Sequence, residues 1–308
     1  MTYLNVHFSS VWLCKSRFFH LSLVLSAAAP LAAECSDAGF CRLPAKPAET
    51  AENRSEQDGQ PVPQLAEKES VWSTGVTLGY ANGDPDEALR YTAVEAQVGW
   101  TPRQSTFLSA AVPWNYASGD DGSTTGIGDL LLTGSQGLSA AWSIALGLRL
   151  PTGDDAALEG AGLAYQPGLG STDVLAALIW QRHGFDVRAG YVASLGTNGT
   201  PGVELERGDD VAAGIGYSPV YGQWEGRIGL LGLLRLEDSK TTASGTAITI
   251  PESAGAQANL QLEAGYRLKP TLLISVEAAV ALIAREKNAN VDGLTRSSSI
   301  SLGATQWW

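Results

Sequence analysis

The chain has 308 residues, of which 44% are hydrophobic and 17% charged, and its formal net charge is −12. An acidic chain argues against nucleic acid as a partner, because that binding depends on basic side chains that displace counterions from phosphates. Glycine is frequent, with 35 residues, and methionine occurs once. Many short, glycine-rich apolar segments favour strands over long helices, so the composition predicts an all-β protein.

The N-terminal region has the pattern of a secretory signal peptide. Lys15 and Arg17 supply positive charge, an apolar run follows over residues 18–31, and Ala33 ends a stretch of small residues that offers a cleavage site. The apolar run is shorter than the roughly 18 residues expected of a spanning helix, which argues against a single membrane anchor. We therefore expect residues 1–33 to be a signal peptide that directs export.

Residues 34–69 are rich in proline and acidic side chains and hold little that a core could bury. This composition predicts a disordered periplasmic linker, with a partner-binding arm as the alternative. Cys35 and Cys41 lie close together within it, and in an oxidising periplasm we expect them to form a small-loop disulfide. Two cysteines without a neighbouring histidine are a poor metal site. We expect neither a metal nor a cofactor.

Over residues 70–308, apolar side chains alternate with polar or small ones. In the clearest run, Ala258, Leu260 and Leu262 are separated by polar side chains. A period of two gives each strand one apolar face and one polar face. We expect twelve strands, near residues 70–81, 90–101, 105–116, 127–137, 140–151, 171–182, 185–195, 210–220, 223–236, 254–268, 271–284 and 294–308.

The connections between these strands alternate strictly between short and long. Short turns are expected at residues 101–104, 138–139, 183–184, 221–222 and 269–270, and long polar loops at 82–89, 117–126, 152–170, 196–209, 237–253 and 285–293. Short turns on one rim and long loops on the other are typical of outer-membrane barrels, and an even strand count leaves both termini in the periplasm. We predict a transmembrane antiparallel up-and-down β-barrel; a soluble β-sandwich is the alternative.

Aromatic side chains near both ends of the strands support a membrane location. Trp100, Trp142 and Trp224 fall near short turns, whereas Trp114 approaches a long loop, as expected of two interfacial girdles. The chain ends in Trp308, preceded by apolar residues at alternate positions except Gln306, which resembles the assembly signal of bacterial outer-membrane barrels. We therefore expect the barrel-assembly machinery, outer-membrane lipid and lipopolysaccharide as partners.

Three glycine-rich stretches suggest a family: Gly126–Leu130, Leu148–Asp154 and Gly168–Val174, each at a rim with long loops. In this order they resemble the outer-membrane barrel family named for the meta-cleavage pathway of phenol degradation, the phenol MetA degradation family. The resemblance covers most of residues 70–308 and is strongest over residues 126–195. The family name implies passage of aromatic or other small apolar molecules.

Charged side chains of both signs are expected to point into the lumen. Strand parity assigns this direction to Asp129, Arg149, Asp173, Arg188, Glu225, Arg227, Arg235, Glu263, Arg267 and Glu277. They predict either a structural network that satisfies inward polar groups or a constriction that selects solute charge. One contact can be predicted specifically. Asp129 and Arg149 lie at nearly equal distances from the turn at 138–139, so we expect them to face each other, and Asp173 completes a cluster near the extracellular mouth.

Catalysis is not expected. His183 is the only histidine of the expected mature chain, and its turn is predicted to face the periplasm. The Ser–His triad of outer-membrane phospholipases acts at the opposite rim. Acidic loop residues such as Asp120 and Asp121 lack the spacing of a calcium motif.

The sequence therefore predicts an outer-membrane passive channel or transporter for small, uncharged or weakly amphipathic solutes, aromatic compounds among them. A structural or adhesive barrel with a filled lumen is the alternative, and an outer-membrane enzyme is the least favoured function. Barrels of about eight strands are filled by side chains and those of about sixteen hold water channels, so twelve strands do not decide between the first two.

Overall fold

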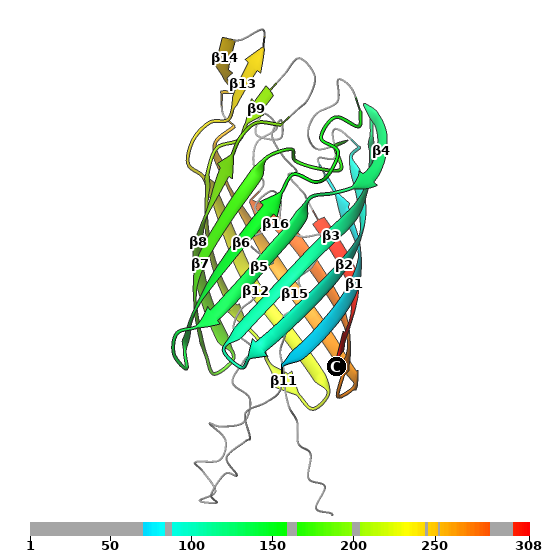
Figure 1. Ribbon diagram of the computed structural model, residues 1–308, viewed down its shortest axis with the longest axis vertical. Coiled ribbons are helices and arrows are strands. Elements are labelled where there is room, and N and C mark those ends of the chain that lie inside the picture. Colours follow the sequence, from blue (N-terminus) through cyan, green and yellow to red (C-terminus); the bar gives the residue numbers. More distant parts are fainter. Residues whose placement is uncertain are drawn as a thin grey trace, which may run out of the picture.

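The computed structural model describes residues 70–83, 88–158, 165–198, 204–243, 246–251, 253–283 and 298–308. Within them, twelve long strands form one closed antiparallel barrel, in which β1 pairs with β17 and β10 pairs with β12 (Figure 1). Over the same residues, no helix is long and apolar enough to cross a membrane. The predicted signal peptide, linker and disulfide lie outside the described residues.

The barrel strands lie within a few residues of their predicted positions. They are β1 (Val71–Asn82), β2 (Arg90–Arg103), β3 (Thr106–Gly119), β5 (Leu130–Gly137), β6 (Trp142–Leu150), β7 (Thr172–Arg182), β8 (Phe185–Leu195), β10 (Asp210–Tyr217), β12 (Trp224–Arg235), β15 (Gly255–Lys269), β16 (Leu272–Ile283) and β17 (Ser298–Trp307). Each pairs with its neighbours along the chain, so the barrel is of the up-and-down type. Both ends of the described chain meet at the short-turn rim, where Trp72 and Trp308 exchange two backbone hydrogen bonds of 3.1 Å.

The loop expected at residues 117–126 was a wrong prediction. Strand β3 continues to Gly119 and turns directly into β4 (Gly122–Ile127), which pairs back onto it. The indole N–H of Trp114 donates to Thr125 Oγ1 at 2.8 Å and ties the two strands together. Gly128 and Asp129 then interrupt the strand pairing before β5 starts. The strand predicted at 127–137 is therefore divided, with Ile127 at the end of β4 and the rest in β5.

Two other predicted loops contain short strands. β9 (Glu204–Glu206), β13 (Lys240–Ala243) and β14 (Thr246–Thr249) form a separate three-stranded antiparallel sheet above the long-loop rim (Figure 1). The β-branched threonine and isoleucine side chains of residues 241–250 suit strand conformation. At the other rim, β11 (Val220–Tyr221) pairs with the start of β12 and tightens the turn between β10 and β12.

The outer face of the barrel is apolar and exposed, as a lipid-facing surface must be. Val76 and Leu146 are more than half exposed on it. Aromatic side chains border this surface at both rims, with Trp72 stacked on Trp100 at 5.6 Å near the short turns and Trp114 exposed near the long loops. The outward band and its two girdles are those of an outer-membrane barrel, and in such barrels the short turns face the periplasm.

The inner face has two unlike walls. Along β15 to β2 it is polar, with side chains such as Gln261, Ser275 and Thr77. Along β5 to β12 it carries an apolar wall of Leu131, Ala145, Leu175, Ala177, Ile179, Val192, Ala212, Leu231 and Leu233, all at most 5% exposed. Alternation alone predicts a polar inner face, but β7 and β12 contain uninterrupted apolar runs, which make both faces apolar there.

Candidate functional site

Apart from Glu277, which lies on β16 opposite Glu263, the predicted lumen residues lie in two groups near opposite rims of the barrel. Those close to the long loops join the rim cluster, which consists of Asp129, Arg149, Asp173, Arg207, Asp210 and Arg235. Those close to the short turns join the vestibule cluster, which consists of Asp186, Arg188, Glu225, Arg227, Glu263 and Arg267. Strand register explains this division, because each residue is fixed at its distance from the nearest turn.

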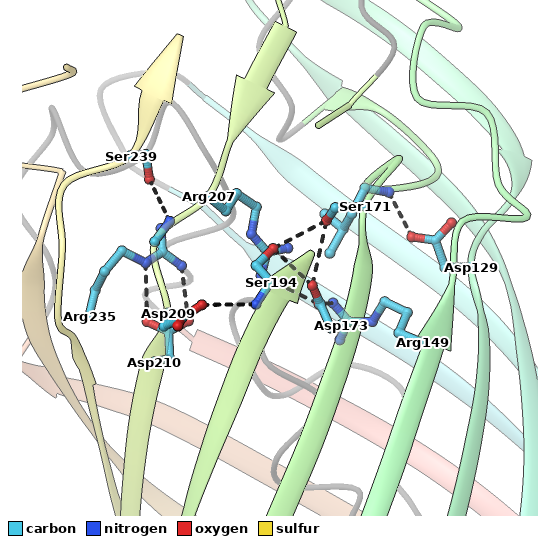
Figure 2. Close-up of polar contacts among 12 residues, drawn as sticks. Asp129, Arg149, Ser171, Asp173, Ser194, Arg207, Asp209, Asp210, Arg235 and Ser239 are labelled. Atoms are coloured by element: carbon cyan, nitrogen blue, oxygen red, sulfur yellow. Dashed lines mark hydrogen bonds and ion pairs between the residues drawn. The ribbon is translucent and has the colours of Figure 1, made fainter. Parts of the chain in front are cut away.

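Asp173 is the centre of the rim cluster (Figure 2). Its carboxylate is fully buried and accepts from Arg149 Nη1 at 2.8 Å and from Arg207 Nη2 at 3.4 Å. Ser194 Oγ on the next strand donates to its Oδ1 at 3.1 Å, and Ser171 Oγ lies 3.5 Å from the same atom. The carboxylate is therefore held by groups from β6, from β8, from the residue just before β7 and from the segment before β10.

Asp129 does not lie where the sequence predicted it. The turn between β5 and β6 takes residues 138–141, which shifts the register and places Leu131 opposite Arg149. Asp129 instead accepts backbone N–H groups, from Gly153 at 3.0 Å and from Leu169 at 2.7 Å. Its carboxylate thus anchors both ends of the loop that follows β6.

Three glycines beside Asp129 pack backbone against backbone and form what we call the glycine node: Gly128, Gly153 and Gly168. A Cβ added at Gly153 would lie 2.8 Å from Gly168 Cα and 2.9 Å from Gly128 Cα, closer than side chains tolerate. Each glycine comes from a different one of the three glycine-rich stretches singled out in the sequence. These stretches are therefore parts of one structural unit at the extracellular mouth.

The end of the loop after β6 folds into the mouth of the barrel. Asn115, on the inner face of β3, donates to the carbonyl oxygen of Pro167 at 2.7 Å, and the hydroxyl of Thr124 donates to the carbonyl of Tyr165. Tyr165 and Gln166 are only 3% and 2% exposed. The long polar loop predicted at residues 152–170 is therefore not wholly exposed, because residues 165–168 are buried in the mouth and narrow it.

A second segment, residues 204–210, crosses the rim and is tied to it by buried ion pairs (Figure 2). Asp210 accepts from Arg235 Nε at 3.1 Å and Nη2 at 3.0 Å, and both side chains are at most 1% exposed. Gly208 N–H donates to Ser239 Oγ, and Arg207 reaches Asp173. Sequence reasoning missed Arg207 because no pattern shows where a loop residue will dock. It also did not assign Asp210 to the lumen, although this residue begins β10 and shares a face with the buried Ala212.

In the vestibule cluster, two arginines share one carboxylate. Asp186 Oδ2 accepts from Arg188 Nη2 at 2.9 Å and from Arg227 Nη2 at 3.2 Å. Arg227 Nη1 also donates to Gln261 Oε1 at 3.1 Å. Strand parity places Asp186 on the same face as Arg188, so the alternation that assigned Arg188 to the lumen could have found Asp186 too.

The remaining vestibule charges are arranged less tightly. Glu225 accepts from Arg267 Nη2, and the Arg267 guanidinium lies 5.4 Å from the ring centre of Trp307, an inward-facing residue. Glu263 lies opposite Arg227 in the strand register but forms no ion pair among the described residues. Arg188, Arg227 and Arg267 remain 12–17% exposed, so this end of the lumen is in contact with water.

The structure shows little that would support catalysis or metal binding. His183 lies in an exposed periplasmic turn with Gly184, and positive φ angles of 52° and 82° form the tight connection between β7 and β8. Within the part of the chain that the structure describes, no three His, Cys, Asp or Glu side chains are grouped so that they could hold a metal ion.

Comparisons with known proteins agree on the architecture. A family model described as "Putative MetA-pathway of phenol degradation" matches residues 67–290. Among solved structures, a COG4313 outer membrane channel from Pseudomonas putida F1 is similar with a TM-score of 0.58 and 15% identity, covering 81% of this chain and 100% of that one. The KdgM porin matches with a TM-score of 0.42 and 10% identity, over 76% and 98% of the two chains. No curated protein matches the sequence.

Proposed function

Because this chain belongs to the outer-membrane family described by the MetA pathway of phenol degradation, we propose that it conducts small solutes passively across the outer membrane. The solutes are mostly uncharged or weakly amphipathic, and aromatic compounds are among them. The observation that carries this proposal is the vestibule cluster. Charged side chains inside a closed barrel keep contact with water at the periplasmic end, as the lining of an aqueous path requires.

The charges of the vestibule favour weak charge selectivity. Three arginines and three carboxylates make up the cluster, so their formal charges cancel. A path lined by both signs gives no long-range field to reject either anions or cations, whereas a ring of one sign would. The buried rim cluster and residues 165–168 obstruct the other end, so the conducting path is narrow or needs the rim to move.

Liposome swelling with phenol-like, sugar and amino-acid solutes tests the proposal. We expect proteoliposomes to swell faster than protein-free liposomes with small phenol-like solutes and much less with sugars. Equal rates with and without protein for every solute would contradict passive conduction. Single-channel recording in planar bilayers gives an independent measure of whether the lumen opens.

A structural barrel with a closed lumen is the second candidate, and one observation favours it. The apolar wall along β5 to β12 is at most 5% exposed, so water does not reach this part of the inner face. A purely structural barrel would show no conductance steps over a wide voltage range and no solute-dependent swelling. A catalytic role is not proposed, because His183 lies on an exposed turn rather than beside a lumen nucleophile.

The barrel-assembly machinery is the partner that we propose for the C-terminal strand. Trp308 is 67% exposed beyond the end of β17, and the side chains of Ile300 and Leu302 face outward on the same strand. Replacing Trp308 with alanine should lower the yield of folded barrel in the outer membrane, measured by heat-modified electrophoretic mobility, while refolding into detergent in vitro remains unchanged.

A further inference from the structure

Three glycines line the inner wall of the barrel beside the two arginines that share Asp186. Gly214, Gly216 and Gly229 lie on the inner faces of β10 and β12, where strand parity would otherwise place side chains. A Cβ at Gly229 would lie 3.0 Å from Arg227 Nη1, and one at Gly214 would lie 3.2 Å from Arg188 Cγ. The absence of side chains there lets both arginines lie flat against the wall.

The hydrogen bonds of this pair leave Arg188 Nη1 as the nitrogen open to a further anion, because Arg227 already donates from Nε and Nη2 to Asp186 and from Nη1 to Gln261 Oε1. Arg188 donates Nε and Nη2 to Asp186 Oδ2, at 3.2 and 2.9 Å, and its Nη1 donates to no group among the described residues. Because this nitrogen is without a partner among those residues and is not buried, it is in contact with water. A guanidinium presents its N–H groups as a planar fork that matches a carboxylate.

The local charge also favours an anion. Asp186 alone contacts both guanidinium groups, through the same oxygen, so the triad of Arg188, Arg227 and Asp186 carries a formal charge of +1 although the charges of the whole cluster cancel. Glu263 is opposite Arg227 in the register, yet it forms no ion pair with either arginine. Two like charges held this close repel each other, and a second anion would relieve that repulsion.

We propose that Arg188 and Arg227 form a binding subsite for the carboxylate group of a small organic monoanion, such as an aryl carboxylate. The choice of an aryl group rests on the proposed function, whereas the choice of a carboxylate rests on the arginine pair alone. A monoanion suits the site because Glu225 and Glu263 in the same cluster would repel a second negative charge. The subsite holds such a solute at the periplasmic end of the path, after it has passed the rim.

Binding can be measured without any transport. The full chain in an uncharged detergent is titrated by calorimetry with sodium benzoate, and with benzamide as the uncharged probe of the same shape. We expect saturable binding of benzoate that weakens with added salt, and benzamide binding at least roughly tenfold weaker, because it cannot form the charge-assisted hydrogen bonds.

Two variants should move the affinity in opposite directions. Arg188→Gln combined with Arg227→Gln should weaken benzoate binding roughly tenfold or more, because it removes both guanidinium charges. Asp186→Asn should strengthen it, because the competing carboxylate is gone and both guanidinium groups become available. The matched control is Arg103→Gln combined with Arg182→Gln, which changes the net charge equally at exposed strand ends outside the lumen and should leave the affinity unchanged.

Equal affinities for benzoate and benzamide, or equal affinities of the lumen and control variants for benzoate, would overturn the subsite. Weaker rather than tighter benzoate binding by the Asp186→Asn protein would also overturn it. This measurement remains informative if the double arginine variant does not fold. Heat-modified mobility establishes folding of each variant. If the protein binds benzoate but gives no liposome swelling, the proposal of passive conduction is contradicted, whereas the proposed subsite is not.

Discussion

The rim cluster and the vestibule cluster use the same residue types in different surroundings. At the rim, Asp173 and the Arg235–Asp210 pair are shut off from water, and the cationic partners come partly from a loop segment that crosses the mouth. In the vestibule, Arg188 and Arg227 share one carboxylate and stay in contact with water. The difference in burial therefore lies in the cations: Arg207 and Arg235 at the rim are at most 1% exposed, whereas the vestibule arginines are 12–17% exposed, as Arg149 is at 12%.

This difference has an energetic basis. A buried charge that loses its partner keeps its full desolvation penalty, whereas a charge in contact with water is partly resolvated and screened. Substitutions at the rim should therefore change stability, and substitutions in the vestibule should change solute binding with little effect on stability.

The largest effect is expected at Asp173. Replacing it with alanine leaves Arg149 and Arg207 without their shared acceptor in a buried site, which should cost about 3–5 kcal/mol of unfolding free energy. Urea unfolding from lipid vesicles, followed by tryptophan fluorescence, measures this loss. A cost similar to that of an exposed ion pair would show that the rim cluster is not sealed from water.

The Arg235–Asp210 pair offers a matched comparison within the rim. Arg235→Met alone should cost about 3–5 kcal/mol, because it removes the guanidinium that forms two hydrogen bonds with a buried carboxylate. Adding Asp210→Leu should recover most of that loss, because a buried apolar pair can replace a buried ion pair at little or no cost. The same unfolding assay applies, and a double variant no better than the single one would refute this account.

A smaller effect is expected at the glycine node. Gly153→Ala places a methyl group against the backbone of Gly128 and Gly168, and overpacking of this kind costs about 1–3 kcal/mol. The matched control is Gly232→Ala on β12, where the nearest atom would be 3.8 Å away. Hydrogen exchange at Leu169 should accelerate in the first variant only, since its N–H is held by Asp129.

The smallest effect on stability is expected in the vestibule. Arg267→Gln breaks the pair with Glu225 and the contact with the Trp307 ring, both at positions that water reaches. The expected cost is under about 1 kcal/mol, as for other solvated ion pairs. A cost as large as that of Asp173→Ala, in the same unfolding assay, would remove the distinction between the two clusters.

The barrel itself could be predicted from the sequence because each strand carries its own signal. Alternation at residues 257–267 and short turns such as His183–Gly184 depend only on neighbouring residues, and they determine strand number, direction and the side on which both termini lie. The same parity placed Arg149, Arg188 and Arg227 on the inner face. The family resemblance was carried by local motifs of the same kind, and the family match over residues 67–290 confirmed it.

What escaped prediction depends on contacts between distant residues. The four-residue turn at 138–141 places Leu131 rather than Asp129 opposite Arg149, and only the packed glycine node shows why the three motifs contain glycine at these positions. The insertion of residues 165–168 into the mouth and the docking of Arg207 on Asp173 likewise have no local signature. Strand identity is a property of short-range periodicity, whereas register offsets, loop docking and burial are decided only when the closed barrel brings separate segments together.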